Sequence, residues 1–148
     1  MSKTISYKGK LAMGLQDKLN LATLNGKTGY KVKKFQILST TPGVGNVEYV
    51  AKITTKDDSA SIASTVDFTD ADIVAVAYLQ DNASSAVSTS ETIIFDNEIF
   101  NQNAFVNITD ASGGTVECNY YIELETVSLS DIESTMLTLK SLRTVASR

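Results

Sequence analysis

The sequence predicts a mainly β protein: an antiparallel β-sandwich, jelly-roll-like in form, with an N-terminal arm and a short C-terminal helix. Several short runs alternate apolar with polar residues, as half-buried strands do. Turn-forming residues separate these runs at intervals of roughly 10–20 residues. Valine, isoleucine, threonine, tyrosine and phenylalanine, which suit strands, are plentiful, and a chain of 148 residues fits one domain.

Residues 1–24 are predicted as the N-terminal arm, because residues 2–10 are largely polar. Four leucines then recur at roughly helical spacing: Leu11, Leu15, Leu19 and Leu24. Gly14 disfavours a helix in this segment, so a short helix and an irregular wrap both remain open. The sandwich domain is expected over residues 25–128, after a turn at Asn25-Gly26.

Two strands are predicted in the lysine-rich first part of the sandwich. Residues 30–38 form the first, and their apolar side chains change face at Lys33-Lys34, which predicts a β-bulge. A loop at 40–46, with one proline and two glycines, leads to the second strand at 47–55. The alternation in this second strand places one apolar set on a single face: Tyr49, Ala51 and Ile53.

The middle of the chain centres on a continuous apolar run at residues 73–79. Such a run predicts a central strand that is buried on both faces. We expect a brief strand at 66–68 before it, an exposed loop at 80–90 after it, and a further strand at 91–95.

Residues 104–125 are predicted to form a β-hairpin, because two alternating runs flank the turn signal Ser112-Gly113-Gly114. The core face of the second run is expected to hold Cys118, Tyr120, Ile122 and Leu124, with Tyr121 and Glu123 on the other face. Cys118 is interpreted as a small buried hydrophobe rather than a reactive thiol. As the one cysteine, it excludes an internal disulfide.

Residues 129–148 are predicted as an amphipathic C-terminal helix, starting at Asp131 and ending near Thr144. Ser130 and Glu133 have the spacing of a capping box. Apolar and long side chains recur at helical spacing after them: Ile132, Met136, Leu139 and Arg143. A strand is the competing interpretation, because alternation is also present around residues 137–140.

Charge is divided unevenly along the chain. Residues 1–56 carry ten lysines and two acids, about +8, whereas residues 57–148 carry three basic residues and fifteen acids, about −12. A fold that preserved this division would have oppositely charged faces, so we predict Lys31, Lys33 and Lys34 as partner-contact residues. The alternative is that folding interleaves the two parts and their fields cancel.

The residues carry no motif that names a reaction. The chain has no histidine, which removes the commonest general base and metal ligand, and one cysteine cannot build a structural zinc site. We therefore predict no catalytic residue, metal or cofactor. The pI of about 4.8 argues against nucleic acid as a partner. No run approaches the roughly 18 apolar residues of a membrane span, and the polar start argues against a signal peptide.

Three stretches in the last third carry a family resemblance: Cys118-Asn119-Tyr120-Tyr121-Ile122-Glu123-Leu124-Glu125, Leu129-Ser130-Asp131 and Leu139-Lys140-Ser141-Leu142-Arg143. Together they resemble small virion structural proteins of marine tailed phages such as cyanophages. The resemblance covers about 40 residues and is a pattern of strand and tail, without a catalytic signature. It implies a capsid-associated or decoration protein, present in many copies and without enzymatic activity.

On this basis we predict a non-enzymatic capsid decoration, cement or minor head protein, made in the host cytoplasm and located in the virion. Its expected partners are the major capsid protein or neighbouring virion proteins. We also expect a homo-oligomer, with a trimer as the first choice and a monomer or dimer as the second. A connector or tail component is the alternative within the virion. From another class, an intracellular β-sandwich module that binds a small ligand inside the sandwich remains open.

Overall fold

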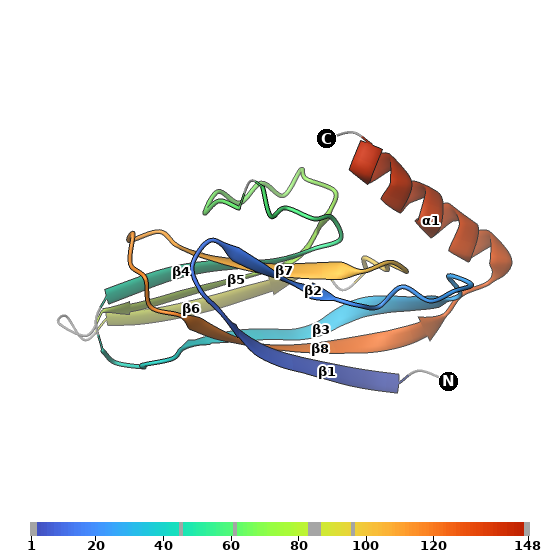
Figure 1. The fold of residues 1–148 in the computed structure, drawn as a ribbon. Coiled ribbons are helices and arrows are strands. Elements are labelled where there is room, and N and C mark those ends of the chain that lie inside the picture. The colour runs from blue at the N-terminus through green and yellow to red at the C-terminus, as the bar shows by residue number, and fades with distance from the viewer. Residues whose placement is uncertain (1–2, 45, 61, 83–86, 96, 147–148) are drawn as a thin grey trace.

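The computed structural model describes residues 3–44, 46–60, 62–82, 87–95 and 97–146. It confirms a mainly β protein with two antiparallel sheets and, among the described residues, one helix at the C-terminal end, consistent with a β-sandwich. The sheets lie face to face, and the helix follows at one end of the sandwich (Figure 1).

The secondary structure elements are named in chain order. The strands are β1 (Lys3–Leu11), β2 (Leu15–Leu19), β3 (Thr28–Ser39), β4 (Asn46–Thr54), β5 (Ile73–Asn82), β6 (Val87–Ile94), β7 (Ala104–Asp110) and β8 (Cys118–Ser128). The helix is α1 (Asp131–Ala146), so the predicted helix is confirmed and the competing strand is wrong.

The last strand of the chain lies at the centre of the smaller sheet. Its order is β1-β8-β3, and the larger sheet has the order β2-β7-β4-β5-β6. Along β1, Lys3 lies opposite Thr126 and Leu11 lies opposite Cys118. β1 and β8 therefore pair although they are more than 100 residues apart in sequence.

The hairpin predicted for residues 104–125 does not form. β7 pairs with β2 and β4 in the five-stranded sheet, whereas β8 pairs with β1 and β3 in the other sheet. The expected turn is present, with Gly113 at φ 82°, but the chain leaves it towards the opposite sheet. The buried Tyr49 holds this crossover, because its hydroxyl donates to the carbonyl oxygens of Val116 at 3.0 Å and Glu117 at 3.2 Å.

The prediction of an N-terminal arm is also wrong, because its described residues add one strand to each sheet, β1 and β2. Gly9 in β1 makes room for the ring of Tyr120. A Cβ on Gly9 would lie 2.6 Å from the hydroxyl oxygen of that ring. The Tyr120 hydroxyl then donates to the Asp17 carboxylate at 2.8 Å, and this bond joins β8 of one sheet to β2 of the other. Burial and this carboxylate raise the pKa of Tyr120.

The hydrophobic core lies between the sheets and confirms the predicted faces of β8. The apolar set is buried: Cys118, Tyr120, Ile122 and Leu124. Tyr121 and Glu123 lie on the other face and remain partly exposed. Burial raises the pKa of the Cys118 thiol to about 12, so this thiol is a core group and not a poised nucleophile.

The bulge is confirmed, because the register between β3 and β8 shifts between Val32 and Lys34. The apolar run in β5 is an interior strand, as predicted. The segment 66–68 is not a strand. The loop expected at 80–90 is instead largely taken up by the ends of β5 and β6, with residues 83–86 outside the described part.

The long connection between β4 and β5 covers part of the outer face of the five-stranded sheet (Figure 1). The Lys52 ammonium donates to the carbonyl oxygen of Thr65 in this connection. The Gln16 side chain donates to Asp57 at 2.8 Å and accepts from the backbone N–H of Asp58 at 2.9 Å. Side chains from two strands thus hold an irregular segment that has no ladder of its own.

Candidate functional site

Helix α1 begins as the sequence predicts. The Ser130 hydroxyl accepts a hydrogen bond from the backbone N–H of Glu133 at 3.2 Å, and the Glu133 carboxylate accepts one from the backbone N–H of Ser130 at 3.1 Å. These reciprocal bonds form the capping box, and they lower the pKa of Glu133. The Lys27 ammonium lies 2.7 Å from the Asp131 carboxylate, so a cation just before β3 meets the acidic first turn of α1.

Polar contacts attach α1 to the sandwich. The buried Asn101 amide donates to the carbonyl oxygen of Gly26 at 2.9 Å, to the carbonyl oxygen of Ser134 at 3.3 Å and to the hydroxyl of Thr138 at 2.9 Å. The Ser134 hydroxyl donates to the carbonyl oxygen of Asn25 at 3.4 Å. We call this set of hydrogen bonds the Asn101 seam. It joins the helix to the turn before β3 and to the segment before β7.

The glycine of the turn at Asn25-Gly26 is required by the Asn101 seam. Gly26 has φ 65°, in the left-handed region that favours glycine. A Cβ here would lie 3.1 Å from the Ser134 hydroxyl and 3.2 Å from the Asn101 amide nitrogen. The turn that the sequence identifies therefore has a second role, since it lets the chain approach α1 closely.

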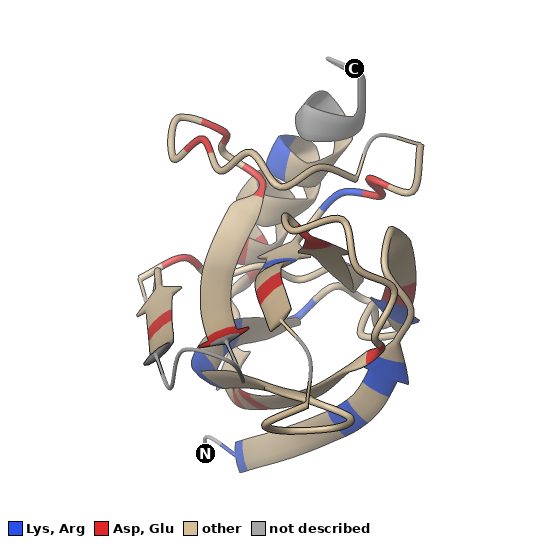
Figure 2. Cartoon of the chain, turned by 90° about the vertical axis from the view of Figure 1, so that its left-hand side faces the viewer, with Lys and Arg blue, Asp and Glu red and all other residues tan. Residues whose placement is uncertain are grey.

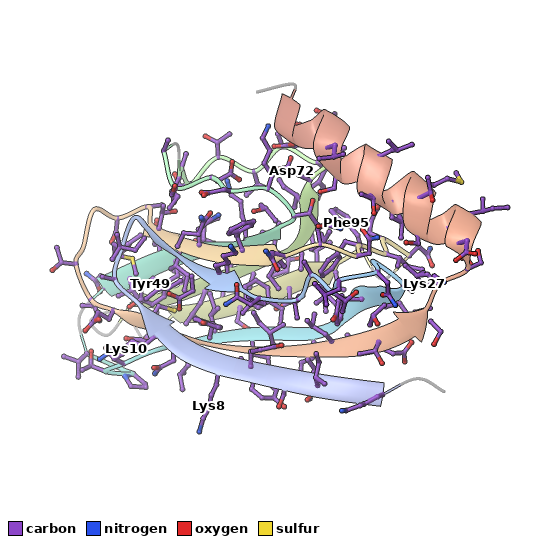
Figure 3. All side chains as sticks on the ribbon, turned by 45° about the vertical axis from the view of Figure 1, so that its right-hand side comes forward. Lys8, Lys10, Lys27, Tyr49, Asp72 and Phe95 are labelled. Carbon is purple, nitrogen blue, oxygen red and sulfur yellow. The ribbon has the colours of Figure 1, made fainter. Side chains whose placement is uncertain are left out.

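The apolar side of α1 faces away from the sandwich. Its large side chains are exposed to 73% at Ile132, 64% at Met136, 53% at Leu139 and 61% at Leu142. We call these four residues the α1 stripe. Figure 3 shows side chains on the outer side of α1 pointing away from the sheets. The spacing of the stripe predicted a helix but not its orientation, which is set by the polar residues on the opposite side.

A hollow runs beside the α1 stripe, between the helix and residues 97–99. Its apolar lining includes Ile99, Leu129, Met136 and Leu137. Lys140, also in the lining, forms an ion pair with Glu98 at 3.1 Å. The stripe and this hollow together form a continuous, partly apolar surface on one flank of the helix.

The three lysines predicted as partner contacts lie together on the outer side of β3. Lys31 forms an ion pair with Glu125 at 3.4 Å, and Lys34 forms one with Glu123 at 3.8 Å. Lys33 occupies the bulge and is exposed. Whether these residues contact a partner stays a prediction.

The ion pairs show how the fold treats the uneven charge of the sequence. β8 carries acids from the second part of the chain, and it lies between two lysine-bearing strands from the first part, β1 and β3. Lys10 of β1 also lies 3.6 Å from Glu117. Figure 2 shows basic and acidic positions on neighbouring segments of the backbone in this view. In the three-stranded sheet, folding therefore interleaves the basic and acidic parts of the chain.

A polar layer lies beneath the β4–β5 connection. Burial lowers the pKa of Lys52, and burial together with the nearby Asp70 carboxylate raises the pKa of Asp58. The buried side-chain oxygen of Asn107, in the neighbouring β7, accepts no hydrogen bond. Within the described ranges, no group of three or more cysteine and acidic side chains is arranged to hold a metal ion.

Large side chains fill the space between the sheets, where the ligand-binding alternative expected a pocket. Those less than 2% exposed include Tyr49, Phe35, Ile53, Ile108, Ile122 and Leu124. The hollow beside α1 lies outside this core, and so does a second shallow hollow, on the β3–β8 surface. No helix in the described part of the chain is long and apolar enough to span a membrane.

Comparison with models of known protein families and with curated protein sequences finds no match for this chain. The candidate site is therefore defined by its own geometry: a helix anchored through polar groups, with its apolar stripe turned outward.

Proposed function

We propose that this chain is a non-enzymatic structural protein of a tailed-phage virion, a decoration, cement or minor head protein that binds the capsid and stabilises the shell. The observation that carries the proposal is the outward α1 stripe. Burying each of its side chains against a protein would contribute roughly 1–2 kcal/mol. Clustered exposure of this kind is typical of a protein contact surface.

The sandwich suits such a role because it presents the stripe from a rigid body. Its core is closed by large buried side chains, and the Asn101 seam fixes the helix at its end. A protein that binds only the assembled shell stabilises that shell by mass action, and many copies add avidity. The partners in this proposal are the major capsid protein or neighbouring virion proteins. Lys31, Lys33 and Lys34, on the outer side of β3, are a second proposed contact.

Copy number in purified particles of the source phage tests the proposal. Quantitative gel densitometry should find tens to hundreds of copies, and particles that lack the protein should lose their genome at a lower temperature. About a dozen copies or fewer would favour the connector or tail alternative. Complete absence from purified particles would contradict the proposed function.

A further inference from the structure

The α1 stripe has the spacing of a helix–helix contact. Ile132, Met136 and Leu139 follow one another at intervals of four and three residues, which is the pattern of a coiled-coil seam. At about 100° per residue, Ser134 and Thr138 of the Asn101 seam lie on the opposite side of the helix. The sandwich therefore contacts one side of α1, and the opposite side, which carries the α1 stripe, can pack against another helix.

Charge indicates which helix fits. Glu133 and Lys140 are seven residues apart, so they lie on the same flank of the α1 stripe. Both line the hollow beside α1. If two copies of α1 pack antiparallel, Glu133 of each copy lies opposite Lys140 of the other. Parallel packing would instead bring this flank against the other flank, which carries Thr135 and Leu142. Antiparallel packing also opposes the two helix dipoles favourably.

We propose that α1 is a two-fold interface between two copies of this chain, packed antiparallel through Ile132, Met136 and Leu139, with reciprocal Glu133–Lys140 pairs. The arrangement is self-complementary, as a two-fold contact requires. The ammonium group of Lys140 has three donors, so it can keep its 3.1 Å contact with Glu98 and also meet the second copy. This inference rests on the proposed function, because it takes a second copy of this chain as the neighbouring virion protein that covers the α1 stripe.

The interface is small, which sets its expected strength. α1 has 16 residues and is about 24 Å long, and each copy contributes three residues of the α1 stripe to the contact. Its buried area falls at the low end for specific contacts, so a dissociation constant that is roughly micromolar or weaker is expected. On a shell, many such contacts would act together and hold neighbouring copies in place.

Sedimentation equilibrium of the purified chain, from about 5 μM to about 500 μM, tests the interface. The parent chain should show a reversible monomer–dimer equilibrium, and Met136→Glu should weaken it more than tenfold. Val44→Glu is the matched control, because Val44 is also 64% exposed but lies in the turn between β3 and β4 at the other end of the sandwich (Figure 1). This control should dimerise like the parent.

A charge swap tests the orientation. Glu133→Lys and Lys140→Glu should each weaken dimerisation of the chain alone, because like charges then meet across the two-fold axis. An equimolar mixture of the two variants should dimerise at least as well as the parent. Glu133→Lys also removes the capping carboxylate, so circular dichroism melts measure whether α1 is still folded in this variant. Met136→Gln is a second, milder variant of the α1 stripe.

Three outcomes would overturn the inference: a parent chain that stays monomeric at the highest concentration, a Met136→Glu dimer as tight as the parent, or a mixture without rescue. These outcomes are separate from those of the proposed function. A monomeric chain whose Met136→Glu variant no longer binds particles would place the stripe against the shell, which overturns the two-fold interface and keeps the virion role. A dimeric chain that is absent from particles would keep the two-fold interface and overturn the virion role.

Discussion

The core between the sheets and the Asn101 seam beneath α1 are built in opposite ways. In the core, residues such as Ile122 and Leu124 are fully buried, and polar side chains lie on the outer faces of the sheets. At the seam, an asparagine amide and helix hydroxyls face inward, and Ile132 and Met136 face outward. The hydrophobic pattern therefore orients the strands, whereas directional hydrogen bonds orient the helix.

The largest effect should come from the core. Ile122→Ala should lower the free energy of unfolding by about 2–4 kcal/mol, because it removes buried methyl groups and leaves a cavity. Urea denaturation measures this loss. Ile93→Ala is the control, because Ile93 is 40% exposed on the edge strand β6 and should cost less than about 1 kcal/mol. Equal costs would mean that β8 is not central to the core.

Loss of the Asn101 seam should have the next largest effect on stability, and it should be confined to α1. Asn101→Ala leaves the Gly26 carbonyl without its buried donor and should cost about 1–3 kcal/mol. Hydrogen exchange should then show lower protection of α1 amides, with protection of β4 amides little changed. Asn103→Ala is the matched control, because Asn103 accepts from the backbone N–H groups of Leu21 and Ala22 rather than holding the helix. Selective loss in α1 after Asn103→Ala would contradict this division.

The helix cap should have a smaller effect. Ser130→Ala removes the hydroxyl that accepts from the Glu133 N–H and should cost about 1 kcal/mol. Thermal melts followed by circular dichroism measure the change. Ser130→Asp should restore most of the stability, since aspartate is also a good N-cap. If Ser130→Ala were as costly as Asn101→Ala, the cap rather than the seam would anchor α1.

The outer face of the three-stranded sheet should have the smallest effect. Glu123→Ala should cost less than about 0.5 kcal/mol, because the ion pair with Lys34 at 3.8 Å is accessible to solvent. A double-mutant cycle with Lys34→Ala in low and high salt gives the coupling between the two side chains. A coupling above about 1 kcal/mol would mean that this face is more than a solvated surface.

The strands that sequence analysis missed share one physical cause. The alternation of Ile5, Tyr7 and Leu11 in β1 is interrupted at Gly9, where the Tyr120 ring needs the space of a side chain. In β2, the inward position between two leucines holds Asp17, which accepts from the same tyrosine. The contacts of the Tyr120 side chain therefore interrupt the apolar–polar alternation in both β1 and β2. A contact between β8 and the N-terminal strands is not visible in local patterns.

Pattern was sufficient where each strand could be judged by itself. The faces of β8, the bulge at Lys33-Lys34 and the capping box follow from spacing alone, and all three are confirmed. Pairing was not predictable, because glycines between two alternating runs fit a hairpin and a crossover between sheets equally well. The outward α1 stripe was not predictable either, since the helix pattern does not say which side the rest of the chain will cover.

The central place of β8 has a consequence for synthesis. β1 and β3 emerge from the ribosome before their shared partner, and at about 5–20 residues per second they wait several seconds for it. Unpaired strand edges invite misassembly, but both waiting strands carry lysines on their future outer faces, such as Lys8 and Lys34, and like charges disfavour their pairing with each other. Nascent chains released before Cys118 should therefore remain protease-sensitive, and those extended past Ser128 should become resistant.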